Sequence, residues 1–106
     1  MSDLLLYQPA EGLSKQMYID ESDRSVYLDG SRRALTEQEY SLLSELAQHP
    51  GEAVSREELL KNAWGYVYPG ETRTVDVHIQ RLRKKLGFRA IETVYRCGYK
   101  LKACRV

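Results

Sequence analysis

The amino-acid sequence predicts an α+β domain in which a small antiparallel sheet comes first, three helices follow and a β-hairpin completes the fold. Three observations support this order. Turn-forming residues interrupt the first 35 residues at short intervals, as they do between short strands. From Thr36 onward the apolar residues recur at helical spacing, and beyond Gly87 they alternate as in strands. The 106 residues, which show no internal repeat or linker, suffice for a single domain over residues 1–106 with one modest core.

Four strands are expected between residues 4 and 35. Their predicted bounds are Leu4–Tyr7, Met17–Ile19, Ser25–Leu28 and Arg33–Leu35. The turn-formers of Gln8–Gly12 separate the first two. Asp29-Gly30 joins the last two and is a strong hairpin signal, because glycine readily takes the positive φ that a type I′ turn requires. A four-stranded antiparallel sheet is the expected result.

Three helices are expected at about residues 37–48, 56–64 and 73–86. Two of them open on cap signals, with Thr36 before the first and Ser55 before the second, and Gly65 is placed to end the second. The third has the sequence RTVDVHIQRLRKKL and gathers its apolar residues on one face, namely Val75, Ile79, Leu82 and Leu86. A hairpin at about residues 91–103 follows it.

Val77 does not fit the apolar face of the third helix. It falls roughly 160° from Ile79, in the middle of a charged surface. Three short helices and a hairpin match a helix-turn-helix with a wing, whose last helix lies in the DNA major groove, where the C5-methyl of thymine is an apolar contact for such a residue. Arg81 could then bind guanine through two hydrogen bonds. The alternative is that Val77 packs under a loop or is one ordinary exposed apolar residue.

Composition and charge exclude several classes of protein. Apolar residues make up 42% of the chain, too many for a disordered tail, and the longest apolar run, Leu4–Tyr7, is too short to span a membrane. No signal-peptide pattern follows Met1, and Cys97 and Cys104 form no disulfide framework, so a reduced cytoplasm is expected. The net charge of +1 hides two unlike halves, since residues 1–50 carry −5 and residues 51–106 carry +6.

The sequence gives almost no support to an enzyme or a metalloprotein. It has no glycine-rich phosphate loop, no paired catalytic carboxylates and no nucleophile motif. The two histidines, His49 and His78, belong to no cluster at ligand spacing, so we expect no metal site and no cofactor. A protein-interaction module on the same scaffold remains as the alternative to DNA binding.

Three segments of the chain resemble a known family. They are LTEQEYSLLSELAQHPGEAVSREELLKNAWG, RTVDVHIQRLRKKL and IETVYRCGYKL. Together with the N-terminal strands, they resemble the DNA-binding effector domain of OmpR/PhoB-type response regulators over nearly the whole chain. The resemblance implies a winged helix-turn-helix that binds double-stranded DNA sequence-specifically as a bacterial transcriptional regulator of two-component type.

The resemblance also implies a set of DNA-contact residues. Positions expected at the sugar-phosphate backbone are Trp64, Arg73, Thr74, Gln80 and Arg83, and Lys84 is a further candidate for DNA binding. Positions expected to face base edges are Asp76, Val77 and Arg81, with Asp76 either accepting from a cytosine amino group or orienting Arg81. Trp64 could instead belong only to the core, Arg83 could be solvated at the flank of the helix, and Lys84 and Lys85 are more often steering charges than contacts. Gln80 stands where family members often carry an arginine.

In the wing, Thr93 and Tyr99 match positions that hold phosphates. Family members often read TVRGxGY here, with the arginine entering the minor groove, whereas this chain reads TVYRCGY. Tyr95 therefore takes the arginine position, and we expect Arg96 to replace the wing arginine, displaced by one residue. Cys97 at the tip is expected to be a small turn residue, with a redox sensor as the less favoured reading.

The resemblance implies further partners. In this family two copies usually bind direct-repeat half-sites in tandem, and the loop between the second and third helices can contact RNA polymerase. That loop carries Tyr66, Val67, Tyr68 and Pro69, whose side chains could equally pack against the domain. No receiver domain precedes residue 1, so we expect either an effector domain excised from a longer chain, with its receiver domain and sensor kinase, or a stand-alone regulator.

Overall fold

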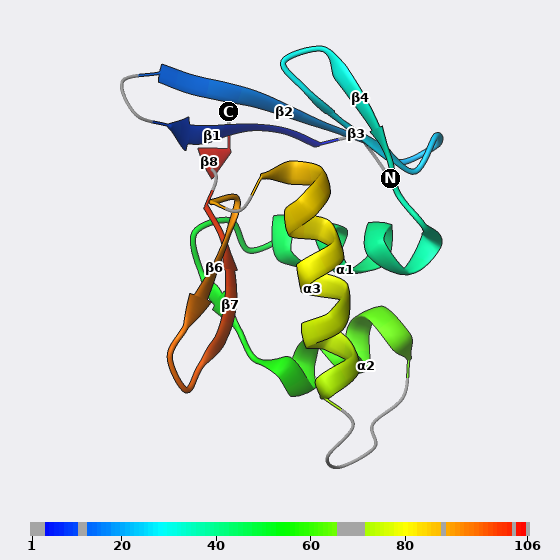
Figure 1. The fold of residues 1–106 in the computed structure, drawn as a ribbon, viewed down its shortest axis with the longest axis vertical. Coiled ribbons are helices and arrows are strands. Elements are labelled where there is room, and N and C mark those ends of the chain that lie inside the picture. The colour runs from blue at the N-terminus through cyan, green and yellow to red at the C-terminus, as the bar shows by residue number, and fades with distance from the viewer. Residues whose placement is uncertain (1–3, 11–12, 66–71, 88, 103, 106) are drawn as a thin grey trace.

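The computed structural model describes residues 4–10, 13–65, 72–87, 89–102 and 104–105, with side chains from residue 16 to 102 within those ranges. Figure 1 shows a sheet above a group of three helices, with a hairpin beside the last helix. The helices are α1 (Glu37–Ala47), α2 (Arg56–Trp64) and α3 (Arg73–Leu86). The strands are β1 (Leu4–Ala10), β2 (Leu13–Asp20), β3 (Ser25–Leu28), β4 (Ser31–Ala34), β5 (Ala53–Val54), β6 (Ile91–Val94), β7 (Gly98–Leu101) and β8 (Cys104–Arg105).

The N-terminal sheet has one strand more than the four that the sequence predicts. Its order is β4-β3-β2-β1-β8, and every neighbouring pair is antiparallel. The added strand β8 pairs with β1 at Leu6↔Arg105 and Tyr7↔Cys104. The expectation of a four-stranded sheet was wrong because the chain returns to the open edge of β1 after the hairpin.

β1 is also longer than predicted, since it continues through residues expected to form a turn. Pro9 lies in the strand and has Ser14 of β2 as its partner in the register. β8 reaches only Leu6 and Tyr7. Pro9 therefore lies where β1 is an edge strand, which is the position in a sheet that tolerates proline.

The predicted hairpin turn at Asp29-Gly30 is confirmed. Both residues have positive φ, 49° and 85°, as a type I′ turn requires, and Leu28 pairs with Ser31 across it. The wing, Ile91–Leu101, differs from the expected two-stranded hairpin. It forms a three-stranded sheet of order β5-β7-β6, because β5 adds Ala53 and Val54 along β7.

The three predicted helices are present, and their caps explain where they begin and end. At the start of α1, the Thr36 side chain accepts from the Glu39 amide while the Glu39 carboxylate accepts from the Thr36 amide. At the start of α2, the Ser55 side chain accepts from the Glu58 amide. Gly65 ends α2 in a left-handed conformation with φ of 80°. No helix among the described residues has the length and apolar character needed to cross a membrane.

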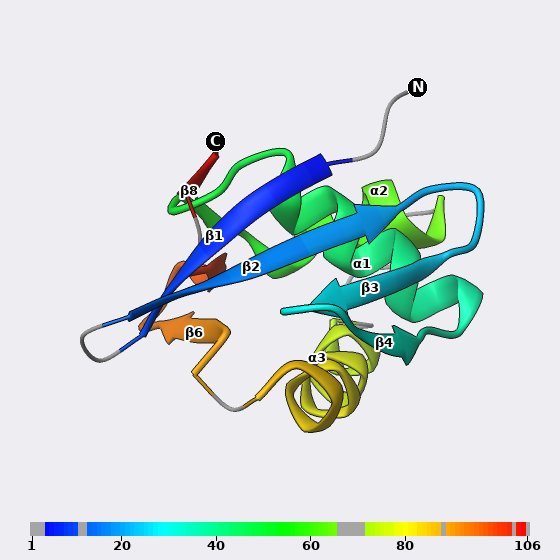
Figure 2. The same cartoon turned by 90° about the horizontal axis from the view of Figure 1, so that it is seen from above.

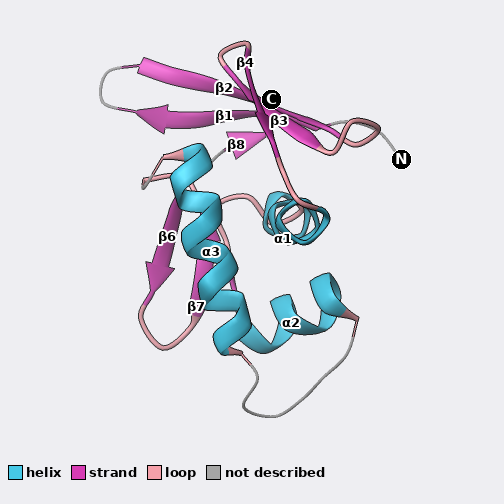
Figure 3. Cartoon of the chain, turned by 45° about the vertical axis from the view of Figure 1, so that its right-hand side comes forward, coloured by secondary structure: helices cyan, strands magenta, loops and turns pink. Residues whose placement is uncertain are grey.

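One core lies between the sheet and the helices. Figure 2 shows the strands β1–β3 lying across the helices, and Figure 3 shows α3 between the β6–β7 hairpin and the other two helices. The buried apolar residues of the sheet are Met17, Ile19, Val26 and Leu28, and those of α1 and α2 are Leu42, Leu43, Leu46, Ala47, Leu59 and Leu60. α3 contributes the predicted stripe of Val75, Ile79, Leu82 and Leu86.

The C-terminal end of α3 is fastened to the sheet by two basic residues. Lys85 Nζ donates to Glu39 Oε1 at 2.5 Å and to the Ala34 carbonyl at 3.0 Å. Arg33 Nη1 donates in return to the Lys85 carbonyl at 2.5 Å. Lys85 is therefore not the solvated charge that the sequence suggested. Burial opposes the ionised form of Glu39, but the hydrogen bonds from Lys85 and the Thr36 amide outweigh it and lower the pKa of Glu39.

Replacing Glu39 with glutamine is expected to reduce the free energy of unfolding by about 1–2 kcal/mol at neutral pH, because Lys85 loses a buried anionic partner but stays partly exposed. The glutamine oxygen can still accept from Thr36. Since the pKa of Glu39 is lowered in the folded state, its contribution is present above the ordinary value of about 4.3 and is lost as the pH falls through the folded-state value. Urea titrations at pH 7 and pH 3 should therefore show a smaller difference from the wild type at pH 3.

Glu92→Gln is the matched control. Glu92 pairs with Lys100 at 3.7 Å and is 46% exposed. Its replacement should cost under about 0.5 kcal/mol. Equal losses from Glu39→Gln and Glu92→Gln would contradict the assigned role of Glu39.

Candidate nucleic-acid interface

α3 presents a continuous exposed face opposite its buried stripe. We call this the outer face of α3, and its residues are Arg73, Val77, Gln80, Arg81 and Lys84. They fall within an arc of about 100° around the helix. Three are basic and none is acidic, so the face is suited to an anion.

Val77 lies within this outer face, as the helical angle predicts. Its side chain is 45% exposed, which excludes a place in the core. Among the described residues, the exposed large hydrophobic side chains are Val77 and Tyr95. Val77 lies on the outer face of α3 and Tyr95 at the turn of the wing. Both positions belong to the elements that the sequence analysis predicts to contact DNA.

Asp76 connects three elements and does not orient Arg81. Its Oδ1 accepts from Arg56 Nε at 2.9 Å and from the Tyr99 hydroxyl at 2.7 Å. Arg56 comes from α2 and Tyr99 from β7. Of the two roles expected for Asp76, the orienting of a guanidinium is thus directed at Arg56 of α2 and not at Arg81. Acceptance from a cytosine amino group stays a prediction.

Tyr99 is a core residue whose hydroxyl is used inside the protein. Only 4% of it is exposed, and the guanidinium carbons of Arg83 and Arg56 lie 5.6 and 5.9 Å from its ring centroid. Burial, with the hydrogen bond to Asp76, raises the pKa of Tyr99, so the phenol stays protonated and donates. The expectation that Tyr99 holds a phosphate does not fit this burial.

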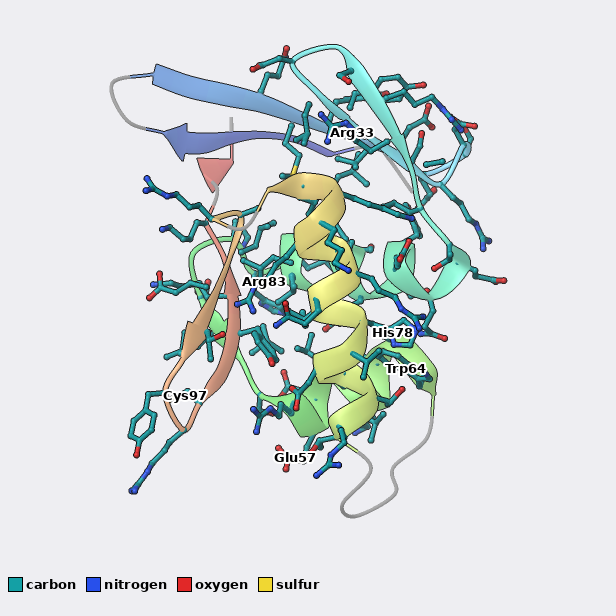
Figure 4. All side chains as sticks on the ribbon, in the orientation of Figure 1. Arg33, Glu57, Trp64, His78, Arg83 and Cys97 are labelled. Carbon is teal, nitrogen blue, oxygen red and sulfur yellow. The ribbon has the colours of Figure 1, made fainter. Side chains whose placement is uncertain are left out.

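Arg83 points toward the wing, where its half-buried guanidinium is hydrogen-bonded within the protein. Its Nε and Nη2 donate to the Ile91 carbonyl at 3.0 and 2.9 Å, and Nη2 also donates to the Thr93 hydroxyl at 2.8 Å. Figure 4 shows the side chain between α3 and the hairpin. The planar guanidinium places two nitrogens against these acceptors in a fixed geometry, whereas a lysine would offer a single nitrogen.

Trp64 lies on the opposite side of α3 from the wing. It is half-buried against the core, and its ring meets His78 edge-on at 5.1 Å between centroids (Figure 4). His78 Nδ1 lies 2.9 Å from the Thr74 carbonyl. Trp64 therefore has a packing role, and its half-exposed surface is still available for the backbone contact that the resemblance implies.

The wing turn carries Tyr95, Arg96 and Cys97, which we call the wing tip. All three are exposed, Tyr95 to 79%, and the Arg96 guanidinium stacks 5.1 Å from the Tyr95 ring centroid. The turn closes through a hydrogen bond from the Cys97 amide to the Val94 carbonyl at 2.9 Å. Arg96 adopts φ of 60°, a left-handed conformation that costs an arginine more than the glycine of the family pattern.

A hollow of about 390 Å³ separates the wing tip from the start of α2. Its lining combines basic and hydroxyl side chains with one acidic residue: Arg56, Glu57, Thr72, Thr93 and Arg96. The sequence did not single out Arg56, because its partners Asp76 and Tyr99 are distant in the chain.

The predicted loop residues Tyr66, Val67, Tyr68 and Pro69 lie outside the described residues.

Comparison with known proteins identifies the family. A family model described as "Transcriptional regulatory protein, C terminal" matches residues 30–101. The chain belongs to this family. The resemblance to OmpR/PhoB-type effector domains is thereby confirmed, and the fold is their α+β winged helix with three helices.

Several regulators are similar to this effector domain. CseB of Streptomyces avermitilis is 47% identical over 88 residues, which cover 83% of this chain and 37% of CseB. VxrB of Vibrio cholerae is 42% identical over 91 residues, which cover 86% of this chain and 37% of VxrB. The chain thus spans well under half the length of these curated relatives.

Solved structures show the same fold. The DNA-binding domain of Klebsiella pneumoniae RstA, in complex with the RstA box, matches with a TM-score of 0.73 at 43% identity, covering 80% of this chain and 89% of that one. The DNA-binding domain of Escherichia coli CpxR matches with a TM-score of 0.72 at 32% identity, covering 80% of this chain and 88% of that one.

Gly98, which directly follows the wing tip, is expected to tolerate no side chain. Its φ is 140°, and an added Cβ would lie 2.0 Å from the Val54 carbonyl oxygen. Gly98→Ala should therefore lower the free energy of unfolding by about 2 kcal/mol or more in a urea titration. Gly30→Ala is the control, because Gly30 also has positive φ but no atom near the added Cβ. Equal losses would show that the close approach to β5 is unimportant.

Proposed function

We propose that this effector domain binds double-stranded DNA sequence-specifically, with α3 in the major groove and the wing at the adjacent minor groove. The outer face of α3 is the observation that carries the proposal. It offers Arg73 and Lys84 to phosphates, and it offers Val77 and Arg81 to base edges. An α-helix with its side chains is about 10–12 Å across, which suits a groove about 12 Å wide.

The contact set that we propose differs from the one that the resemblance implies. It keeps Arg73, Thr74, Val77, Gln80, Arg81 and Lys84 of α3, Trp64 of α2, and Thr93, Tyr95 and Arg96 of the wing. Asp76, Arg83 and Tyr99 are assigned to the scaffold instead, since their hydrogen bonds join α3 to α2 and to both strands of the wing. The wing tip lies beyond this scaffold, where Arg96 is free to reach a groove.

The wider role that we propose is that of a bacterial transcriptional regulator of two-component type. It includes direct-repeat half-sites occupied by two copies in tandem, contact with RNA polymerase, control through a receiver domain and sensor kinase, and action in the cytoplasm. These partners rest on family membership and not on the geometry. A protein-interaction module is less favoured, because the exposed large hydrophobics of the described residues, Val77 and Tyr95, form no broad apolar patch.

Selection of bound sequences from a random duplex pool tests the proposal. Recovery of two similar half-sites in direct repeat, about one helical turn apart, would support tandem reading of the major groove. Weak binding without enrichment, lost as salt rises, would leave a basic surface that reads no sequence.

Val77→Ala is expected to remove a preference for thymine at one fixed position of the selected site. The loss of two methyl groups from an apolar contact should cost roughly 1 kcal/mol, or about fivefold in affinity, at that position only. Lys84→Ala is the control, because losing a phosphate contact should weaken binding to all sequences alike and reduce the salt slope by about 1. An unchanged thymine preference in Val77→Ala would remove the reason for placing Val77 at a base.

Arg96→Ala is expected to weaken binding most where the flank beside the half-site is A·T-rich. A narrow minor groove concentrates negative potential and attracts arginine, so the loss should be about fivefold there and smaller beside G·C-rich flanks. Fluorescence anisotropy on two duplexes that differ only in the flank measures this. Equal losses on both duplexes would show that Arg96 does not enter the minor groove.

A further inference from the structure

A single rung of the wing is held by two side chains of α3. Thr93 of β6 and Tyr99 of β7 are partners across the hairpin. Arg83 donates to the Thr93 hydroxyl at 2.8 Å, and Asp76 accepts from the Tyr99 hydroxyl at 2.7 Å. We call Thr93 and Tyr99 the braced rung. Each strand of the wing is thus tied to α3 at the same level of the ladder.

The two anchors lie on one side of α3. Asp76 and Arg83 are two turns apart, so they project within about 20° of each other and about 10 Å apart along the axis. This side lies between the buried stripe and the outer face. The anchors can hold the wing without using any residue of the outer face.

Arg83 holds more than the rung itself. Its Nε and Nη2 also share the Ile91 carbonyl, and its guanidinium lies over the Tyr99 ring at 5.6 Å. Displacing Arg83 would break contacts to both strands of the wing, because its acceptors Ile91 and Thr93 lie in β6 and the Tyr99 ring lies in β7.

The braced rung lies next to the wing tip. Only the pair Val94↔Gly98 separates it from the turn, and Gly98 is itself pressed against Val54. The position of the rung therefore sets the position of Arg96 relative to Val77 on the outer face.

We propose that Asp76 and Arg83 are positioning residues that hold the wing tip at a fixed distance from the outer face of α3. The outer face and the tip can then enter neighbouring grooves of DNA together. This inference rests on the proposed function, and it gives Arg83 a positioning role within the protein.

Hydrogen exchange of the free protein tests the brace without DNA. Arg83→Lys keeps the positive charge but loses the planar guanidinium that binds Ile91 and Thr93. It should speed hydrogen exchange of the wing amides, including that of Cys97, on the order of tenfold. The amides of α1 should exchange as in the wild type. Arg81→Lys makes the same chemical change on the outer face and should alter no amide. Unchanged wing exchange in Arg83→Lys, or one common factor at every amide, would overturn the proposal.

Tyr99→Phe provides a second variant if Arg83→Lys does not fold. It removes only the hydroxyl that binds Asp76 and leaves the buried ring in place. Faster exchange confined to the wing supports the brace, and wild-type exchange in the wing overturns it.

A DNA-binding measurement then tests whether the contacts of Asp76 and Arg83 to the wing affect sequence recognition. On the selected site, the wild type should prefer A·T-rich flanks, and Arg83→Lys should lose that preference while it keeps the preference for thymine opposite Val77. Retention of the full flank preference by Arg83→Lys would overturn the positioning role. A wild type that selects no sequence would refute the proposed function, and the exchange experiment would still decide whether the brace exists.

Discussion

The burial of Val75, Ile79, Leu82 and Leu86 fixes the rotation of α3, and every other surface of the helix takes its direction from that packing. Once this stripe faces the core, helical geometry turns Val77 and Arg81 outward and turns Asp76 and Arg83 toward the hairpin. A further side carries His78 against Trp64. One helix therefore serves as core element, as reading surface and as the support of the wing, with each task on a separate side.

Much of this could be predicted from periodicity. The helices, the Asp29-Gly30 turn and the exposure of Val77 follow from local spacing and cap chemistry, which act within a few residues. The short strands β5 and β8 could not be found in this way, because two residues carry no period and their pairing is decided by tertiary packing. The partners of Arg83 and Lys85 were missed for a related reason, since pairs between charged residues distant in the chain leave no local pattern.

The wing tip shows where the chain departs from the family pattern at a structural cost. Arg96 occupies a left-handed position that glycine adopts freely, while the neighbouring Gly98 cannot be changed because a backbone oxygen lies against it. The wing therefore keeps glycine at Gly98, where a side chain cannot fit, and carries Arg96 at the position of the other family glycine. Stacking of the guanidinium on Tyr95 partly offsets the strain and shapes the exposed end of the hairpin.

The pairing of β8 with β1 affects how the domain folds as it is synthesised. Within this domain, β1 is synthesised well before the residues that pair with its outer side, Cys104 and Arg105. Until they arrive, a row of backbone donors and acceptors on β1 stays open, and such an edge invites pairing with another chain. The pairing of β8 with β1 also joins residues far apart in the sequence, which raises the contact order, and such pairings form more slowly than helices.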